Sequence, residues 1–204
     1  MHGIILKGLK DFVVDTYDQQ TWNQICEAAD IERRLYVPVT EYPDEHVFAL
    51  VEAAVDLSGE EPADLLRAFG RFVVPQLVQT YGVHVDEDWT GLDLIENVER
   101  YIHQALRSKN ISTFDPPGID ARRIDAGTVV VDYDSDRQLC DVAMGLVQGI
   151  GEHYDESLDV EERQCMHDGA PSCKFVVTGA TEEVDAITSQ RARVDGGDTP
   201  THEQ

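Results

Sequence analysis

Apolar side chains recur every three or four positions through the first half of the chain. This spacing lines one face of an α-helix. It is clearest between residues 43 and 57, where Pro43 suits a first helical turn and Gly59 suits a helix stop. The pattern predicts helices over residues 3–18, 21–29, 43–57, 62–81 and 90–109. We expect Pro75 to bend the fourth helix and Thr90 to cap the fifth.

The pattern changes after Phe114, where an Asp-Pro-Pro-Gly sequence predicts a stiff turn. Short runs rich in β-branched residues then predict strands over residues 119–124, 127–134, 157–164 and 174–178, with one helix over 136–154. The predicted fold class is α+β: a helical subdomain over about 1–110, then a mainly antiparallel sheet with a helix over about 111–178. Residues 179–204 carry few apolar side chains and no aromatic ones, so we expect a disordered acidic tail.

The chain is strongly acidic, with 40 Asp and Glu against 16 Lys and Arg and a formal net charge of −24. Such a surface repels nucleic-acid phosphates and anionic membranes, which excludes both as partners. Adaptation to high salt, in a halophilic protein, is one explanation, and a basic partner protein is another.

Neither a signal peptide nor a membrane anchor is expected. No apolar run reaches the roughly 18 residues that a membrane-spanning helix needs, and the N-terminal sequence does not resemble a signal peptide. We therefore expect a cytoplasmic protein, in which cysteines serve as thiols or metal ligands. We expect no enzyme activity, because the sequence has neither a phosphate-binding loop nor a paired nucleophile and base.

Tyr133, Ser135 and Arg137 occupy alternate positions at the end of a predicted strand. In an extended segment these side chains point to one face, and the two hydroxyls and the guanidinium suit an acidic ligand. Tyr133 and Arg137 would lie about 13 Å apart at full extension. This span favours a ligand with two acidic groups, particularly if the chain turns at Ser135.

His103 lies at the edge of the apolar stripe of the helix predicted over 90–109, which consists of Leu92, Ile95, Val98, Ile102 and Leu106. It could be a partly buried histidine bonded to a backbone carbonyl, or an axial ligand of a bound metal. The histidine alone does not distinguish these alternatives.

Taken together, these residues resemble the heme–nitric oxide/oxygen binding (H-NOX) family, related to the heme domain of soluble guanylate cyclase. The opening Met1-His2-Gly3-Ile4-Ile5 and the segment from Tyr42 to Phe48 are similar to two early signatures of that family. His103 stands on the helix that carries the family's heme-ligating histidine, and Tyr133-x-Ser135-x-Arg137 matches its YxSxR motif.

The resemblance implies a heme-based gas sensor with heme b as cofactor. His103 would ligate the iron, the YxSxR residues would hold the propionates, and Pro116 or Pro117 would press on the porphyrin or simply form a rigid turn. The neighbouring pocket positions are all aliphatic: Ile5, Leu9, Val73, Leu77 and Val142. Family members that bind oxygen stably carry a tyrosine at the position of Val142, so this pocket would favour nitric oxide and carbon monoxide.

In the family, nitric oxide weakens or breaks the iron–histidine bond. The resulting change of shape would pass to a separate partner, such as a histidine kinase, a cyclic-dinucleotide enzyme or a chemotaxis transducer. The alternative function is a heme-free domain of the same fold that binds a small ligand or senses redox state through zinc or thiols.

Cys140, Cys165 and Cys173 form a second candidate site. Tetrahedral zinc could use three thiolates and one further ligand. Some family members hold a structural zinc here with three cysteines and a histidine; the matching position is Glu162, and His167 is another candidate for the fourth ligand. The cysteines could equally be metal-free thiols, or Cys165 and Cys173 could join on oxidation.

Overall fold

The first part of the chain folds into helices as its apolar spacing predicts. The computed structural model describes residues 1–104, 107 and 116–180. Its first helices are α1 (Gly3–Thr16), α2 (Gln19–Ala28), α3 (Asp44–Ser58) and α4 (Pro62–Tyr81), followed by the short 3₁₀ helix η1 (Gly82–His84). Gly59 ends α3 with a positive φ of 69°, a conformation that glycine adopts without strain. Helix α4 continues through Pro75.

The predicted helix over 90–109 is an α-helix only in its first part. Helix α5 (Gly91–Val98) begins at Thr90, whose side chain accepts a hydrogen bond from the Asp93 backbone while the Asp93 carboxylate accepts one from the Thr90 backbone. This capping box satisfies two donors that a helix start leaves unpaired. The chain then passes into a π-helix, η2 (Glu99–His103), which the apolar spacing does not predict. The rest of the predicted helix lies almost entirely outside the described residues.

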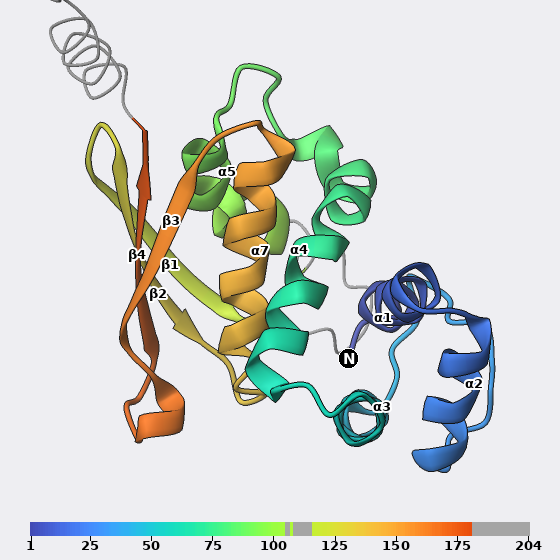
Figure 1. Ribbon diagram of the computed structural model, residues 1–204. Helices are drawn as coiled ribbons and strands as arrows, with labels where there is room; N and C mark the ends of the chain where they lie inside the picture. The colour runs from blue at the N-terminus through green and yellow to red at the C-terminus, as the bar shows by residue number, and fades with distance from the viewer. Residues whose placement is uncertain (105–106, 108–115, 181–204) are drawn as a thin grey trace, which may run out of the picture.

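The second part of the chain forms an antiparallel sheet of four strands, as predicted. The strands are β1 (Gly118–Asp125), β2 (Thr128–Asp134), β3 (Leu158–Gln164) and β4 (Cys173–Gly179), in the spatial order β1-β2-β4-β3. Helix α7 (Cys140–His153) connects β2 to β3, and the 3₁₀ turn η3 (Met166–Asp168) lies between β3 and β4. The register places Val131 opposite Phe175 and Tyr133 opposite Cys173, so their side chains share the sheet face on which α5 and α7 pack (Figure 1).

Buried apolar side chains form two separate cores. One core joins α1 to α4 and contains Leu6, Phe12, Trp22, Leu50 and Phe69. The other lies between the sheet, α5 and α7 and contains Ile95, Val129, Met144, Phe175 and Val177. No helix in the described part of the chain is long and apolar enough to cross a membrane.

The two cores meet where α4 packs along α7 (Figure 1). The helices approach so closely that a Cβ on Gly145 would lie 2.2 Å from the carbonyl oxygen of Arg67. A side chain cannot fit at that distance, so glycine is required there. Two polar pairs flank the contact: Arg67 donates to Asp141 at 2.9 Å and Arg71 donates to Gln148 at 2.8 Å. This helix pair sets the spacing between the two cores.

Candidate functional site

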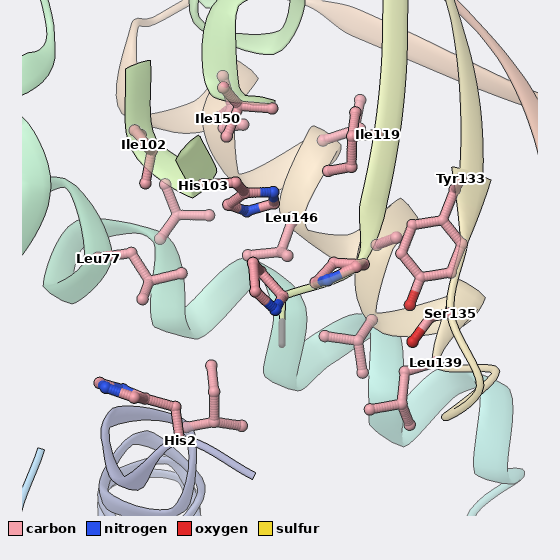
Figure 2. A pocket seen from close by; sticks show the side chains of 18 of the residues that line it. His2, Leu77, Ile102, His103, Ile119, Tyr133, Ser135, Leu139, Leu146 and Ile150 are labelled. Carbon is pink, nitrogen blue, oxygen red and sulfur yellow. The ribbon is translucent and has the colours of Figure 1, made fainter. Parts of the chain in front are cut away.

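A cavity of about 280 Å³ lies between the two cores. Its walls are mainly aliphatic and aromatic and come from α1, α3, α4, α5, α7 and the sheet. Most of the residues that the sequence singles out line it: Ile5, Leu9, Leu77, His103, Pro116, Pro117, Tyr133, Ser135, Arg137 and Val142. In Figure 2, His103 projects into the pocket, with Tyr133 and Ser135 on one side and Leu77 on the other.

Val73, the remaining predicted wall residue, does not line the cavity. It is fully buried in the N-terminal core, where one methyl group faces Gly8 of α1. Val74, Leu77 and Val78 form the wall instead. Val73 shares a four-residue row with Phe69 and Leu77, which line the cavity, but its own side chain packs against Gly8 of α1.

Sequence reasoning missed other wall residues. Leu146 and Ile150 follow Val142 at four-residue intervals along α7, so the helix period could have found them. His2 also lines the cavity and is only 7% exposed. It lies at the far side of the pocket from His103 in Figure 2. Burial lowers its pKa, and the nearby Glu41 partly opposes that shift.

His103 is the last residue of η2, and its side chain is only 14% exposed. Its Nδ1 lies 3.1 Å from Oε2 of Glu99. Burial lowers the pKa of His103, although the hydrogen bond with Glu99 and the backbone of Pro117 partly oppose that shift. The imidazole is therefore neutral at pH 7, which is the form that binds metals.

Tyr133, Ser135 and Arg137 face inward at the end of β2. Asp134 and Asp136 between them are exposed, so the predicted alternation is present. The strand ends at Asp134, and the Gln138 amide donates to the Ser135 carbonyl at 2.9 Å, which closes a turn. Burial raises the pKa of Tyr133 to about 12, partly opposed by its hydrogen bond with Ser135. Its hydroxyl therefore keeps its proton at pH 7 and can donate to an anion.

Asp44, at the start of α3, connects this segment to the N-terminal subdomain. Its Oδ2 accepts from Arg137 Nε at 2.9 Å, and its Oδ1 lies 2.6 Å from the N-terminal ammonium of Met1. Burial acts to raise the pKa of Asp44, but the hydrogen bonds from Met1 and Arg137 outweigh it and hold that pKa below its ordinary value. Arg137 is thus oriented by a carboxylate on the opposite side of the subdomain boundary.

The three candidate cysteines form a cluster at the start of α7, where Cys140 is the first helical residue. The Cys165 sulfur lies 3.8 Å from the sulfurs of Cys140 and Cys173. The ligand atoms of these cysteines and of Glu162 all lie within 4.8 Å of one another. Glu162 Oε1 is buried, and a hydrogen bond between the Glu162 carboxyl group and the Cys165 thiol raises the pKa of that thiol. Three thiols and a carboxylate that converge in this way form a donor set that fits zinc.

His167 does not belong to this cluster. Its Nε2 lies 3.1 Å from the Gln138 carbonyl oxygen, and its side chain is exposed. Glu162 pairs with Phe175 across β3 and β4, so it faces the inner side of the sheet, toward the thiols. Of the two predicted fourth ligands, the fold therefore brings only Glu162 to the cysteines.

The residues around the cavity fit a heme. An apolar pocket with a few convergent polar groups is typical of a cofactor site. The neutral His103 imidazole supplies a donor for iron, while the Tyr133 and Ser135 hydroxyls and the Arg137 guanidinium supply donors for carboxylates. A metalloporphyrin with two propionates needs both kinds of group: a ligand for its metal and donors for its carboxylates.

Comparison with known proteins agrees with this fold. The model of the haem-NO-binding (HNOB) family matches residues 2–162. A search of curated protein sequences found no match. The structure is similar to a crystal structure of an H-NOX protein from S. oneidensis in the Fe(II)NO ligation state, with 25% identity and a TM-score of 0.81 over 89% of this chain and 100% of that chain.

Two further solved structures share the fold. An NMR structure of the SO2144 H-NOX domain from Shewanella oneidensis in the Fe(II)CO state has 25% identity and a TM-score of 0.78, over 89% of this chain and 100% of that one. An unliganded Fe(II) H-NOX protein from K. algicida has 18% identity and a TM-score of 0.77, over 89% of this chain and 98% of that one. The fold is thus that of an H-NOX domain. The chain belongs to the haem-NO-binding family.

The Asp44 contacts predict a pH-dependent contribution to stability. Because its pKa is lower in the folded state, the carboxylate stabilises the fold above its ordinary pKa near 3.8, and this contribution disappears as pH falls further. Asp44→Asn should lower the free energy of unfolding at pH 7 by about 1–2 kcal/mol. Urea unfolding at pH 7 and at about pH 3 should show the difference from wild type shrinking at the lower pH.

Asp11→Asn is the matched control. Asp11 pairs with Lys7 on the surface, at 2.5 Å and with its side chain 43% exposed, so its loss should cost less than about 0.5 kcal/mol. Equal effects of the two substitutions at pH 7 would contradict the role of Asp44.

Proposed function

We propose that this protein is a heme-based gas sensor that responds to nitric oxide and signals to a separate partner protein. The observation that carries the proposal is the placement of His103 and the Tyr133-Ser135-Arg137 segment on the wall of one apolar cavity between the two cores. We assign the sensor domain to residues 1–178.

Each of these residues has a role in the proposed site. His103 would hold the iron of a bound heme through its neutral imidazole. Tyr133, Ser135 and Arg137 would hold the propionates, and Asp44 orients Arg137. Pro116 and Pro117, in the segment before β1, would form the part of the wall near His103. The heme b iron, when bound, supplies a coordination position for a diatomic gas.

The gas preference follows from the chemistry of the wall on α1, α4 and α7. Ile5, Leu9, Leu77, Val142 and Leu146 are aliphatic and offer no hydrogen bond to a gas. A hydrogen-bond donor in the wall would favour oxygen as a ligand of a bound heme, whereas nitric oxide and carbon monoxide depend on a donor much less. These five aliphatic positions support nitric oxide and carbon monoxide as ligands in preference to oxygen, while His2 and Tyr81 are polar side chains at other positions of the same cavity.

The output is a change in the arrangement of the two subdomains. The cavity lies between their cores, and α4 and α7 contribute both to its wall and to the subdomain contact. A gas that weakens the bond between His103 and the heme iron would favour one arrangement of the two subdomains over another. A histidine kinase, a cyclic-dinucleotide enzyme or a chemotaxis transducer would suit as the partner.

The cysteine cluster supports a second candidate site. We propose that Cys140, Cys165, Cys173 and Glu162 bind one zinc ion that holds the start of α7 against the loop between β3 and β4. The observation that favours zinc is the convergence of four ligand atoms within 4.8 Å of one another, with Glu162 Oε1 buried among them.

The heme proposal is tested by absorbance. Purified protein supplemented with heme should show a Soret band, and His103→Ala should abolish or strongly weaken it. His153→Ala is the control, because His153 is exposed at the end of α7. Protein that stays colourless after heme supplementation would refute the sensor and favour the heme-free alternative.

The gas preference is tested at Val142. Ferrous wild-type protein should bind nitric oxide and carbon monoxide but should not hold oxygen stably in air. Val142→Tyr adds a hydroxyl donor to the wall and should give a longer-lived spectrum in air, whereas Val142→Phe adds similar bulk without the hydroxyl and should not. A persistent oxygen-bound spectrum of the wild type, or equal behaviour of the two variants, would contradict the assignment.

The zinc proposal is tested by metal analysis. We expect about one zinc per chain after purification without chelator. Cys140→Ser should remove most of it and Glu162→Gln should weaken retention, because each removes one ligand. His167→Ala should retain zinc like the wild type. Zinc-free wild-type protein in which oxidation joins Cys165 to Cys173 would instead support a thiol redox function.

A further inference from the structure

A carboxylate lies against His103 on the side of its Nδ1 atom. Glu99 Oε2 is 3.1 Å from that nitrogen, and the two side chains are only 24% and 14% exposed. A neutral imidazole carries one proton, and a carboxylate accepts only hydrogen bonds. With its proton on Nδ1 the ring donates to Glu99 and leaves the Nε2 lone pair for a metal, and the Pro117 carbonyl is a second acceptor beside the same ring.

The backbone at this point has an unusual form. Glu99 and His103 are the first and last residues of the π-helix η2, and the Gln104 amide bonds to the Glu99 carbonyl five residues earlier. Short π-helical segments occur frequently at functional sites. Here the segment joins the carboxylate and the imidazole in one turn, with His103 facing the cavity.

Arg107 binds the same carboxylate from the other side. Its guanidinium pairs with Glu99 Oε1 and also donates to the carbonyl oxygens of Pro116 and Pro117, at 3.4 and 3.2 Å. The arginine thus draws part of the negative charge of Glu99 away from His103. It also connects the carboxylate to the proline segment on the cavity wall.

This geometry has a consequence for the proposed heme site. A carboxylate that accepts a hydrogen bond from a metal-bound histidine orients the ring and raises its basicity as a ligand. A more basic imidazole binds iron more strongly, and the strength of that bond sets how readily a gas on the opposite side can displace the histidine.

We propose that Glu99 is a positioning residue for the iron ligand. Through His103 Nδ1 it strengthens the iron–histidine bond, and Arg107 limits that effect by sharing the carboxylate charge. Together, Glu99 and Arg107 set the fraction of nitric oxide-bound protein in which the iron–histidine bond is broken. This inference rests on the proposed heme function.

The iron–histidine stretching frequency of the ferrous protein, measured by resonance Raman spectroscopy, tests the inference directly. Glu99→Gln preserves size and removes the charge, so it should shift the band to lower frequency. It should also increase the fraction of nitric oxide-bound protein that has lost the histidine, measured by electron paramagnetic resonance. Arg107→Gln should shift both quantities in the opposite direction.

Glu96→Gln is the matched control. Glu96 is three residues earlier, and its carboxylate binds Arg123 at 2.9 Å instead of His103. It should leave the band unchanged. An unchanged band in Glu99→Gln would overturn the inference while the heme function stands. An equal shift in Glu96→Gln would show a general effect of charge, and it would overturn the inference as well. Failure of the wild type to bind heme would overturn both.

Discussion

The close packing of α4 on α7 is the constraint on which the site depends. Gly145 lets the two backbones approach to a distance that any side chain would prevent. That distance sets how far apart the two cores lie, and the cavity occupies the space between them. The same two helices supply facing parts of the cavity wall, with Val74, Leu77 and Val78 on α4 and Val142 and Leu146 on α7. The fold cannot change this helix contact without changing the pocket.

Two carboxylate–arginine pairs act on the polar residues of the pocket. Asp44 holds Arg137, and Arg107 holds Glu99, which in turn contacts His103. Other arginines bind across elements in the same way: Arg67 and Arg71 link α4 to α7, and Arg123 links β1 to α5. In a chain with a net charge of −24, these arginines are among only 16 Lys and Arg residues, and most of them bind a polar side chain of a neighbouring element. The acidic excess gives the protein its general surface character, whereas the arginines give the site its geometry.

The sequence predicts the fold and much of the pocket because their signals repeat. The helical and strand periods recur over many residues, and the YxSxR motif places its three side chains at alternate positions, so that they share one face of an extended segment. Single positions are harder to predict. Val73 and Leu77 share a helix row, yet α1 covers Val73 while Leu77 and Val74 line the cavity, and the helical period does not reveal that covering contact. Glu162, rather than His167, meets the cysteines because β3 pairs with β4 in a register that no local pattern specifies. Glu99 could not be distinguished from the sequence because it is one of 40 acidic residues, and its role comes from a π-helical turn.

Helix α7 connects the cysteine cluster to the pocket. Cys140 begins the helix only three residues after Arg137, and Val142 and Leu146 line the cavity from its first two turns. A metal bound by Cys140 would hold the start of α7 in place, and with it both the Arg137 turn and the aliphatic wall. Three thiolates and a carboxylate would give the zinc site a net charge of −2, one unit more negative than with a histidine as the fourth ligand. The burial that raises the pKa of Cys140 makes that charge costly without the metal. Loss of zinc would therefore return protons to the thiols and loosen the helix end that carries the pocket wall.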